Sequence, residues 1–191
     1  MVYLVRHGRP LIDRSRPARE WPLDPAYAAD VRALRPRLPA HADWFCSPEP
    51  KAVATARLLT DEPVEVVDDL REHERRSTDW IEDFESVVRR AFARPEVPAY
   101  DGWAPLAETR RRVVTAVAGI LDQHPRRDVV LVGHGTAWTL LRAALTDEPP
   151  DLDAWARLAM PDVVEVPEPV GAASMRPKSG VLGRPGDMLA P

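Results

Sequence analysis

The chain has 191 residues, a length typical of one domain that buries about two-thirds of its unfolded surface. Hydrophobic residues make up 45 % and charged residues 29 % of the sequence, and the formal net charge is −4. These values argue against a disordered chain and against nucleic acid as the main partner. The single cysteine, Cys46, excludes an internal disulfide and a cysteine-based metal cluster. No apolar run reaches the roughly 20 residues of a membrane span, so we expect a cytoplasmic protein with no membrane partner.

Short apolar runs alternate with longer segments of helical periodicity along the chain. The runs that predict strands are residues 2–5, 43–46, 64–67, 129–133 and 163–166. Alternation of this kind is typical of α/β proteins whose parallel strands are covered by helices. We therefore predict a doubly wound α/β fold with a mainly parallel sheet and helices on both faces.

Helix starts are marked by capping residues, prolines and the spacing of apolar side chains. The predicted helices begin at Asp24-Pro25, Ser47-Pro48, Thr78, Pro105 and Thr136. Beyond Pro167 the chain is rich in Gly, Pro and Ser and shows little periodicity. We predict one domain over residues 1–170 and a loosely ordered C-terminal tail over residues 171–191.

Two histidines follow predicted strands at the point where each strand ends. His7 lies between Arg6 and Gly8 after the first strand, and His134 lies between two glycines after the fourth. Ligands of such sheets bind beyond the carboxyl ends of the strands. Glycine lets the backbone approach a ligand closely, and the helix after His134 offers free N–H groups at its positive end. One histidine at a strand end is more often structural, but the two together predict an anion site.

Two further polar features follow the second and third strands. Lys51 falls in the first turn of a predicted helix, where a cation opposes the helix dipole and costs stability unless an anion is bound nearby. The alternative is a solvated surface lysine. The third strand leads into the charged run 70–76, in which a carboxylate can face the same edge, although most such runs are solvated loops.

Taken in order, four segments of the chain resemble the histidine phosphatase superfamily, also called phosphoglycerate mutase-like proteins. They are Val5-Arg6-His7-Gly8, the stretch from Ser47-Pro48 through Lys51-Ala52 to Thr55-Ala56, Leu70-x-Glu72, and Val132-Gly133-His134-Gly135. The order and spacing match the family over about residues 1–145. The Arg-His-Gly tripeptide alone is weak, whereas the combination is specific.

The resemblance implies hydrolysis of a phosphate monoester through a phosphohistidine, with no metal ion and no other cofactor. His7 is the implied nucleophile, and it must be unprotonated to attack phosphorus. The residues implied to hold the phosphoryl group are Arg6, Lys51, His134 and Gly135.

The resemblance also implies a general acid after the third strand. Glu72 is expected to protonate the leaving group and then to activate water, and Glu74 is the alternative. The implied partner is a small phosphorylated molecule, with a phosphoprotein as a further possibility. The sequence identifies neither the natural substrate nor the oligomeric state.

The chain departs from the usual family pattern at the phosphate site. Lys51 stands where arginine is usual, Arg9-Pro10 replaces a Glu-Thr pair, and Asp13 replaces an asparagine. A lysine offers a point charge in place of a planar fork of donors, so we expect a weaker grip on phosphate. Two other functions therefore stay open, namely a phosphomutase that uses the same site and a non-catalytic module that binds a phosphorylated ligand.

Overall fold

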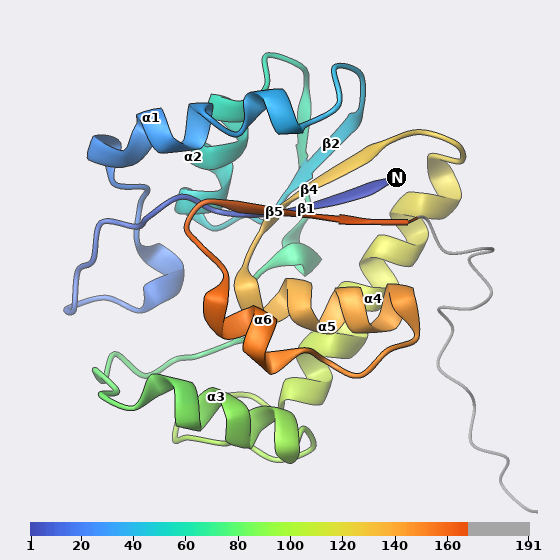
Figure 1. The fold of residues 1–191 in the computed structure, drawn as a ribbon. Helices are drawn as coiled ribbons and strands as arrows, with labels where there is room; N and C mark the ends of the chain where they lie inside the picture. The colour runs from blue at the N-terminus through green and yellow to red at the C-terminus, as the bar shows by residue number, and fades with distance from the viewer. Residues whose placement is uncertain (168–191) are drawn as a thin grey trace, which may run out of the picture.

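A five-stranded sheet with the order β3-β2-β4-β1-β5 runs through the centre of the computed structural model, which describes residues 1–167 (Figure 1). Its strands are β1 (Val2–Arg6), β2 (Asp43–Cys46), β3 (Val64–Val66), β4 (Val129–Gly133) and β5 (Asp162–Val166). The first four pair in parallel, and β5 pairs antiparallel to β1 at one edge. All five lie within one residue of the predicted strands, so the mainly parallel sheet is confirmed. The predicted tail, residues 171–191, lies outside the described residues.

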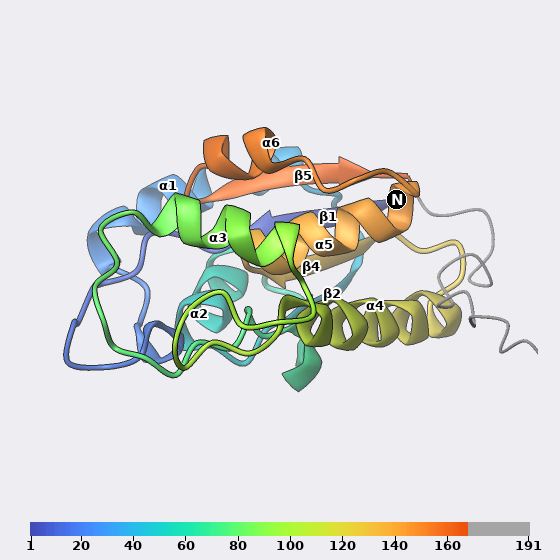
Figure 2. The ribbon, with the colours of Figure 1, turned by 90° about the horizontal axis from the view of Figure 1, so that it is seen from below.

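Helices cover both faces of the sheet, as predicted (Figures 1 and 2). They are α1 (Ala28–Arg32), α2 (Pro50–Leu59), α3 (Phe84–Ala93), α4 (Leu106–Gln123), α5 (Gly135–Thr146) and α6 (Leu152–Arg157). The first two cover one face, α4 and α5 cover the other, and α3 lies away from the sheet (Figure 2). Within residues 1–167, no helix is both long enough and apolar enough to cross a membrane.

The central strands are buried on both sides, which explains their nearly continuous apolar sequences. Along β4, Val129 and Leu131 belong to the apolar cluster that includes α4 and α5. Val130 and Val132 belong to the cluster that includes α1 and α2. Alternate residues of one strand therefore anchor both helical layers, and each buried side chain contributes about 1.5–3 kcal/mol.

Three helices differ from their predicted extents, and one helix was not predicted. The helix α2 begins at Pro50, with Glu49 at its N-cap, and not at Ser47-Pro48. The side chain of Asp24 accepts a hydrogen bond from the Ala26 N–H at 2.9 Å, as expected of a cap, but the segment that follows divides into α1 and short 3₁₀ turns. The third helix begins at Phe84, with Asp83 as its cap, and not at Thr78. The helix α6, capped by Asp151, was not predicted because its six residues are too short for a clear periodicity.

Hydrogen bonds continue the parallel ladder one residue past the carboxyl ends of two strands. The His7 N–H donates to the Gly133 carbonyl oxygen, and the Ser47 N–H donates to the Val132 carbonyl oxygen, each at 2.9 Å. The backbones of His7 and Ser47 are thereby fixed at the same edge at which β4 ends before His134. The sheet itself sets the positions of these three residues.

Candidate functional site

The rings of His7 and His134 lie edge to face at the carboxyl edge of the sheet, with their centroids 5.2 Å apart and an interplanar angle of 66°. Both line a cleft of about 920 Å³. The other predicted site residues line the same cleft: Arg6, Lys51, Glu72 and Gly135. The structure thus brings together residues that the sequence separates by more than 120 positions, and the alternative candidate Glu74 lies at the same cleft.

His7 presents one free ring nitrogen to the cleft. Its Nδ1 lies 2.7 Å from the Gly8 carbonyl oxygen, which can only accept, so Nδ1 carries the proton and donates it. No described residue forms a hydrogen bond with Nε2, which therefore holds a lone pair. Burial, together with the charges of His134 and Lys51, lowers the pKa of His7 to about 3. At neutral pH the ring is uncharged and nucleophilic at Nε2.

His134 is buried and contacts two residues that follow β2. Its Nε2 lies 2.7 Å from Ser47 Oγ and 3.4 Å from Glu49 Oε1. Burial is the main cause that lowers the pKa of His134 to about 3, although the Glu72 carboxylate opposes the shift. This histidine is also neutral in the ligand-free site, and a bound anion would favour its protonated form.

Glu49 is a buried acid that sequence reasoning did not single out. Its carboxylate accepts hydrogen bonds from Lys51 Nζ at 2.5 Å and from the Glu72 N–H at 2.9 Å. Lys51 is itself 5 % exposed and also donates to the Ala18 carbonyl oxygen at 2.7 Å. The solvated alternative for Lys51 is therefore wrong, and the anion expected near it is supplied by the protein. An acidic residue two positions before a lysine at a helix start was the only sequence signal for this pair.

The Glu72 carboxylate binds the beginning of α5. It accepts hydrogen bonds from the N–H groups of His73, Thr136 and Ala137 at 2.8, 3.1 and 3.0 Å. Burial raises its pKa, but Arg75, His134 and these N–H groups outweigh that effect and lower the pKa of Glu72 to about 2. The expectation of free N–H groups at this helix start is thus wrong for Thr136 and Ala137, whose N–H groups already have an anionic partner.

Arg75 is a second feature that sequence reasoning missed, because in the charged run 70–76 only the carboxylates Glu72 and Glu74 were singled out. Its guanidinium lies 4.6 Å from the centroid of Trp103 and 4.8 Å from that of Phe84, and it donates to Thr136 Oγ1 at 3.2 Å. Burial lowers the pKa of Arg75, and the charge of Glu72 opposes that shift. The aromatic rings hold a cation over the same cleft.

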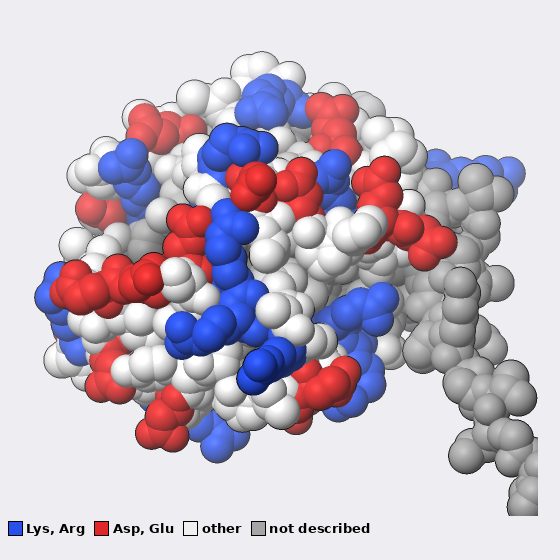
Figure 3. Space-filling model, turned by 60° about the horizontal axis from the view of Figure 1, so that its bottom comes forward, with Lys and Arg blue, Asp and Glu red and all other residues white. Residues whose placement is uncertain are grey.

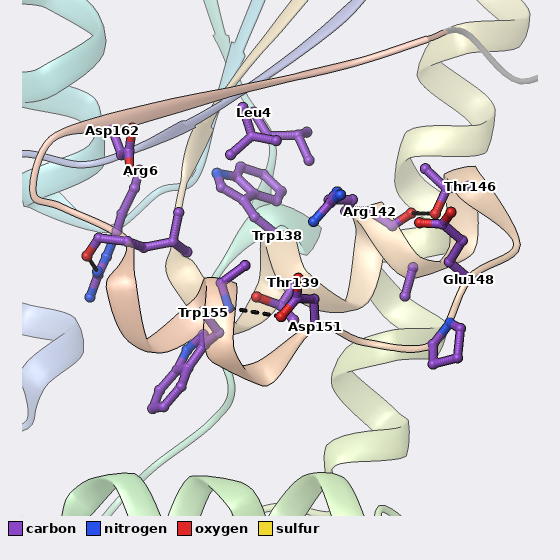
Figure 4. A pocket seen from close by; sticks show the side chains of 15 residues that line it. Leu4, Arg6, Trp138, Thr139, Arg142, Thr146, Glu148, Asp151, Trp155 and Asp162 are labelled. Atoms are coloured by element: carbon purple, nitrogen blue, oxygen red, sulfur yellow. Dashed lines mark hydrogen bonds between the residues drawn. The ribbon is translucent and has the colours of Figure 1, made fainter.

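Arg6 lies between the main cleft and a smaller cavity of about 90 Å³ beside α5 and α6 (Figure 4). Its Nη1 donates to the Leu158 carbonyl oxygen at 2.5 Å, and Figure 4 shows Asp162 close to the same side chain. A Cβ on Gly135 would lie 3.3 Å from Arg6 Nε. Arg6 is therefore held against the first residue of α5, beside His134.

Four buried side-chain nitrogens have no hydrogen-bond partner among residues 1–167, and all four belong to residues that line the main cleft. They are Arg6 Nε, His73 Nδ1, Arg75 Nε and His134 Nδ1. Buried polar atoms without partners are rare in folded proteins. Arg6 Nε and Arg75 Nε are N–H donors of cationic groups, so these two indicate a site for an anionic ligand. His73 Nδ1 is an acceptor, because Nε2 of that ring donates to the Ala104 carbonyl oxygen at 2.7 Å. The same stretch of chain holds no group of three or more His, Cys, Asp or Glu side chains arranged to bind a metal ion.

The glycines beside the two histidines are required by packing. A Cβ on Gly8 would lie 2.6 Å from Val31 Cγ2 and 2.7 Å from Leu23 Cδ1, and a Cβ on Gly133 would lie 2.5 Å from the Trp138 ring. The Gly8 N–H also donates to Thr55 Oγ1 at 3.0 Å. The interpretation that these glycines admit a ligand is therefore wrong for Gly8 and Gly133, whose missing side chains make room for the core.

We expect the free energy of unfolding to fall as the pH falls from about 6.5 toward 4. Burial lowers the pKa values of His7, His134 and His73 to about 3, 3 and 4, so the unfolded chain binds more protons than the folded one in this range. Each histidine contributes at most about 1.4 kcal/mol per pH unit. Below pH 4.5 Glu72 lowers the free energy of unfolding further, because its carboxyl group takes up a proton there in the unfolded chain, whereas its folded pKa is about 2.

Urea unfolding at several pH values between 8 and 4 measures this slope. The variant His73→Gln removes one buried histidine and should make the slope shallower. A slope that is the same in His73→Gln and in the unaltered protein would contradict the assignment.

Known proteins match this chain both in sequence pattern and in structure. A family model of the histidine phosphatase superfamily (branch 1) matches residues 2–166. YhfR of Bacillus stearothermophilus has a similar structure, with 25% sequence identity, a TM-score of 0.66, and coverage of 88% of this chain and 92% of that one. None of the curated proteins compared with this chain matches it significantly.

Two more distant solved structures share the fold. A mycobacterial glucosyl-3-phosphoglycerate phosphatase is 19% identical, with a TM-score of 0.67 and coverage of 85% of this chain and 87% of that one. A phosphoserine phosphatase of Entamoeba histolytica, solved with phosphoserine, is 14% identical, with a TM-score of 0.68 and the same coverage of both chains.

Proposed function

The chain belongs to the histidine phosphatase superfamily (branch 1), and from this membership we propose that it hydrolyses a phosphate monoester through a phosphohistidine formed on His7. The observation that carries the proposal is the neutral His7 ring, whose Nε2 has no hydrogen-bond partner among the described residues, in a cleft that Arg6, Lys51 and Arg75 also line. The Nε–H groups of Arg6 and Arg75, which have no partner among the described residues, support an anionic ligand at the same place. The proposed substrate is a small phosphorylated molecule, and the cytoplasm is the expected compartment.

In the first step, the lone pair of His7 Nε2 attacks phosphorus, and the bond from phosphorus to the ester oxygen breaks. Arg6, Arg75 and a protonated His134 stabilise the charge on the phosphoryl oxygens. These donors are already fixed in the ligand-free cleft, so little reorganisation is needed when the charge develops. The product of this step is a phosphorylated histidine and an alcohol.

In the second step, water attacks the phosphorus, the bond to Nε2 breaks, and inorganic phosphate leaves. Glu72 is proposed to give a proton to the departing alkoxide in the first step and to take a proton from the attacking water in the second step. The free carboxylate is ionised because its pKa is about 2, so the negative charge of bound phosphate has to raise that pKa before Glu72 donates. The substrate would thus create its own proton donor.

The Glu49–Lys51 ion pair favours a second candidate, a module that binds a phosphorylated ligand without turning it over. Lys51 has its Nζ engaged by Glu49 and by the Ala18 carbonyl oxygen, so a phosphoryl group must compete for it. The carboxylate also places a negative charge 3.4 Å from His134 Nε2. The free His7 Nε2 favours catalysis over this candidate.

Hydrolysis of p-nitrophenyl phosphate in the presence of EDTA tests the proposed function. We expect release of nitrophenolate, with inhibition by inorganic phosphate. Binding of inorganic phosphate without any release of nitrophenolate would contradict the phosphatase proposal and support the binding module. Transfer of the phosphoryl group to an added alcohol in preference to water would instead support a phosphomutase.

We expect Lys51→Ala to weaken the binding of inorganic phosphate about tenfold or more and to lower the free energy of unfolding by about 3 kcal/mol, because it leaves the buried Glu49 carboxylate without its partner. Glu49→Gln should tighten phosphate binding about threefold to tenfold, since it removes a like charge beside the site. Product inhibition and urea unfolding measure the two quantities.

The double variant Glu49→Gln/Lys51→Ala separates the two effects. It removes both charges, so most of the lost stability should return, while phosphate binding stays weaker than in Glu49→Gln alone. If Lys51→Ala binds phosphate as the unaltered protein does, the ion pair is only structural and Lys51 has no part in the site.

A further inference from the structure

The outer part of the cleft carries exposed apolar side chains. Ile12, Trp80 and Phe84 are 52%, 46% and 37% exposed, and all three line the cleft that contains His7. Large apolar groups left exposed in a concave surface are a mark of ligand sites. Phe84 also packs against the Arg75 guanidinium, but Ile12 and Trp80 have no part in the proposed chemistry, so the position of these apolar groups at the cleft needs a further explanation.

These apolar groups are held in defined places by two segments that form walls of the cleft. One follows β1, and there Trp21 Nε1 donates to the carbonyl oxygens of Asp13 and Arg16 at 2.6 and 3.1 Å. The other precedes α3 and carries Trp80, whose ring centroid lies 3.9 Å from the Arg14 guanidinium carbon. The ribbon shows both segments at the same end of the molecule (Figures 1 and 2).

The charged side chains of the outer cleft largely neutralise one another. Three arginines of these walls pair with neighbouring carboxylates: Arg16 with Asp13 at 3.7 Å, Arg19 with Glu20 at 3.8 Å, and Arg71 with Asp68 and with Asp69. Figure 3 shows acidic and basic side chains interspersed over one face, with several basic side chains adjoining near its centre. Arg14 forms no ion pair among the described residues, and its guanidinium lies against the Trp80 ring. Most of the wall charge is therefore compensated within the protein, and the cation of Arg14 is presented together with an aromatic surface.

The cleft is also much larger than a phosphate group requires. Its volume of about 920 Å³ falls in the range of pockets that enclose drug-sized molecules. A substrate with only a few carbon atoms would leave Ile12, Trp80 and Phe84 in contact with water. A larger apolar group would cover them and gain the free energy of removing that surface from water.

We propose that the substrate of this cleft is a phosphate monoester of a bulky, uncharged, aromatic or aliphatic alcohol, whose apolar part lies against Ile12, Trp80 and Phe84. The inference rests on the proposed function in taking the phosphoryl group to His7. It adds the chemical class of the leaving group, which follows from the exposed apolar side chains of the cleft.

Binding of three phosphonates, measured by isothermal titration calorimetry, tests the proposal without turnover, because their carbon–phosphorus bond is not an ester. The probes are 3-phenylpropylphosphonate, n-propylphosphonate and 2-carboxyethylphosphonate. We expect the phenyl compound to bind about tenfold more tightly than the propyl compound, and the carboxyethyl compound to bind no better than the propyl one. Equal affinities of the phenyl and propyl compounds, or tightest binding of the carboxyethyl compound, would overturn the proposal.

Two variants test whether the preference for the phenyl compound comes from the cleft. Trp80→Ala and Ile12→Ser should each lower the ratio of phenylpropyl to propyl affinity at least threefold, and a ratio unchanged in both contradicts the proposed surface. Val97→Ser is the matched control, because Val97 is 51% exposed and does not line the cleft. If p-nitrophenyl phosphate is not hydrolysed while the phosphonate preference holds, the phosphatase proposal fails and the ligand class stands.

Discussion

We expect His7→Ala to abolish the release of nitrophenolate from p-nitrophenyl phosphate, to the level of the uncatalysed reaction, while the protein stays folded. The reason is that the proposed attack on phosphorus uses Nε2 of this ring, which carries a lone pair and has no hydrogen-bond partner among the described residues. Without it, the two-step route has no covalent intermediate, and the remaining donors can bind phosphate but cannot transfer it. Circular dichroism and urea unfolding check that the fold is kept.

A trapping experiment tests directly whether a phosphohistidine forms on His7. Brief incubation with a radiolabelled phosphate monoester should leave an acid-labile, alkali-stable label on the unaltered protein and none on His7→Ala. His134→Ala should keep some label, because it loses electrostatic stabilisation worth a few kcal/mol but keeps the nucleophile. His41→Ala, at an exposed position, serves as the control for a histidine outside the cleft. Full turnover by purified His7→Ala would refute the mechanism.

The second large effect is expected for Glu72→Gln, and it should depend on the leaving group. A general acid matters most when the leaving alcohol is a poor one, so hydrolysis of an alkyl phosphate should fall about a hundredfold or more. Hydrolysis of p-nitrophenyl phosphate should fall distinctly less. The measurement is kcat/KM for both esters.

Glu74→Gln is the matched control for this prediction. Glu74 pairs with the exposed Arg76 at 2.8 Å, whereas the Glu72 carboxylate lies at the start of α5, beside His134. We therefore expect Glu74→Gln to be near neutral for both esters. A loss of equal size for both esters in Glu72→Gln would show that the residue acts by holding α5 and not by moving a proton, and a leaving-group-dependent loss confined to Glu74→Gln would transfer the role to that residue.

The sequence predicted the sheet well because each strand is a short apolar run buried on both faces, which is a local signal. It also placed His7 and His134 together, since the carboxyl ends of parallel strands meet at one edge. The start of α3 was harder to predict. Thr78 and Asp83 both have side chains that can cap a helix. In the structure Asp83 is the N-cap and accepts a hydrogen bond from the Ser86 N–H. Packing of Phe84 on Trp103 favours this start, and that contact is tertiary.

The charged residues Glu49 and Arg75 of the site were harder to predict from the sequence. Glu49 and Arg75 belong to residue types that are almost always exposed, and the only local signal was the spacing of Glu49 and Lys51 at a helix start. Most of their partners are remote in the chain: Trp103 and Thr136 contact Arg75, and the Glu72 N–H donates to Glu49, which Lys51 also contacts. Pairwise compensation of buried charges is a property of the folded arrangement, and a linear pattern does not reveal it.

The tight packing around Gly8 and Gly133 bears on how such a sequence changes over generations. A side chain at either position would meet the Val31 and Leu23 side chains or the Trp138 ring, so a descendant that had lost all chemistry would still need both glycines in order to fold. His134 is itself buried and contacts Ser47 Oγ, whereas the ring of His7 forms only one hydrogen bond. The two glycines thus record inheritance of the fold, and His7 is the residue of the two motifs that records whether selection for a reaction has continued.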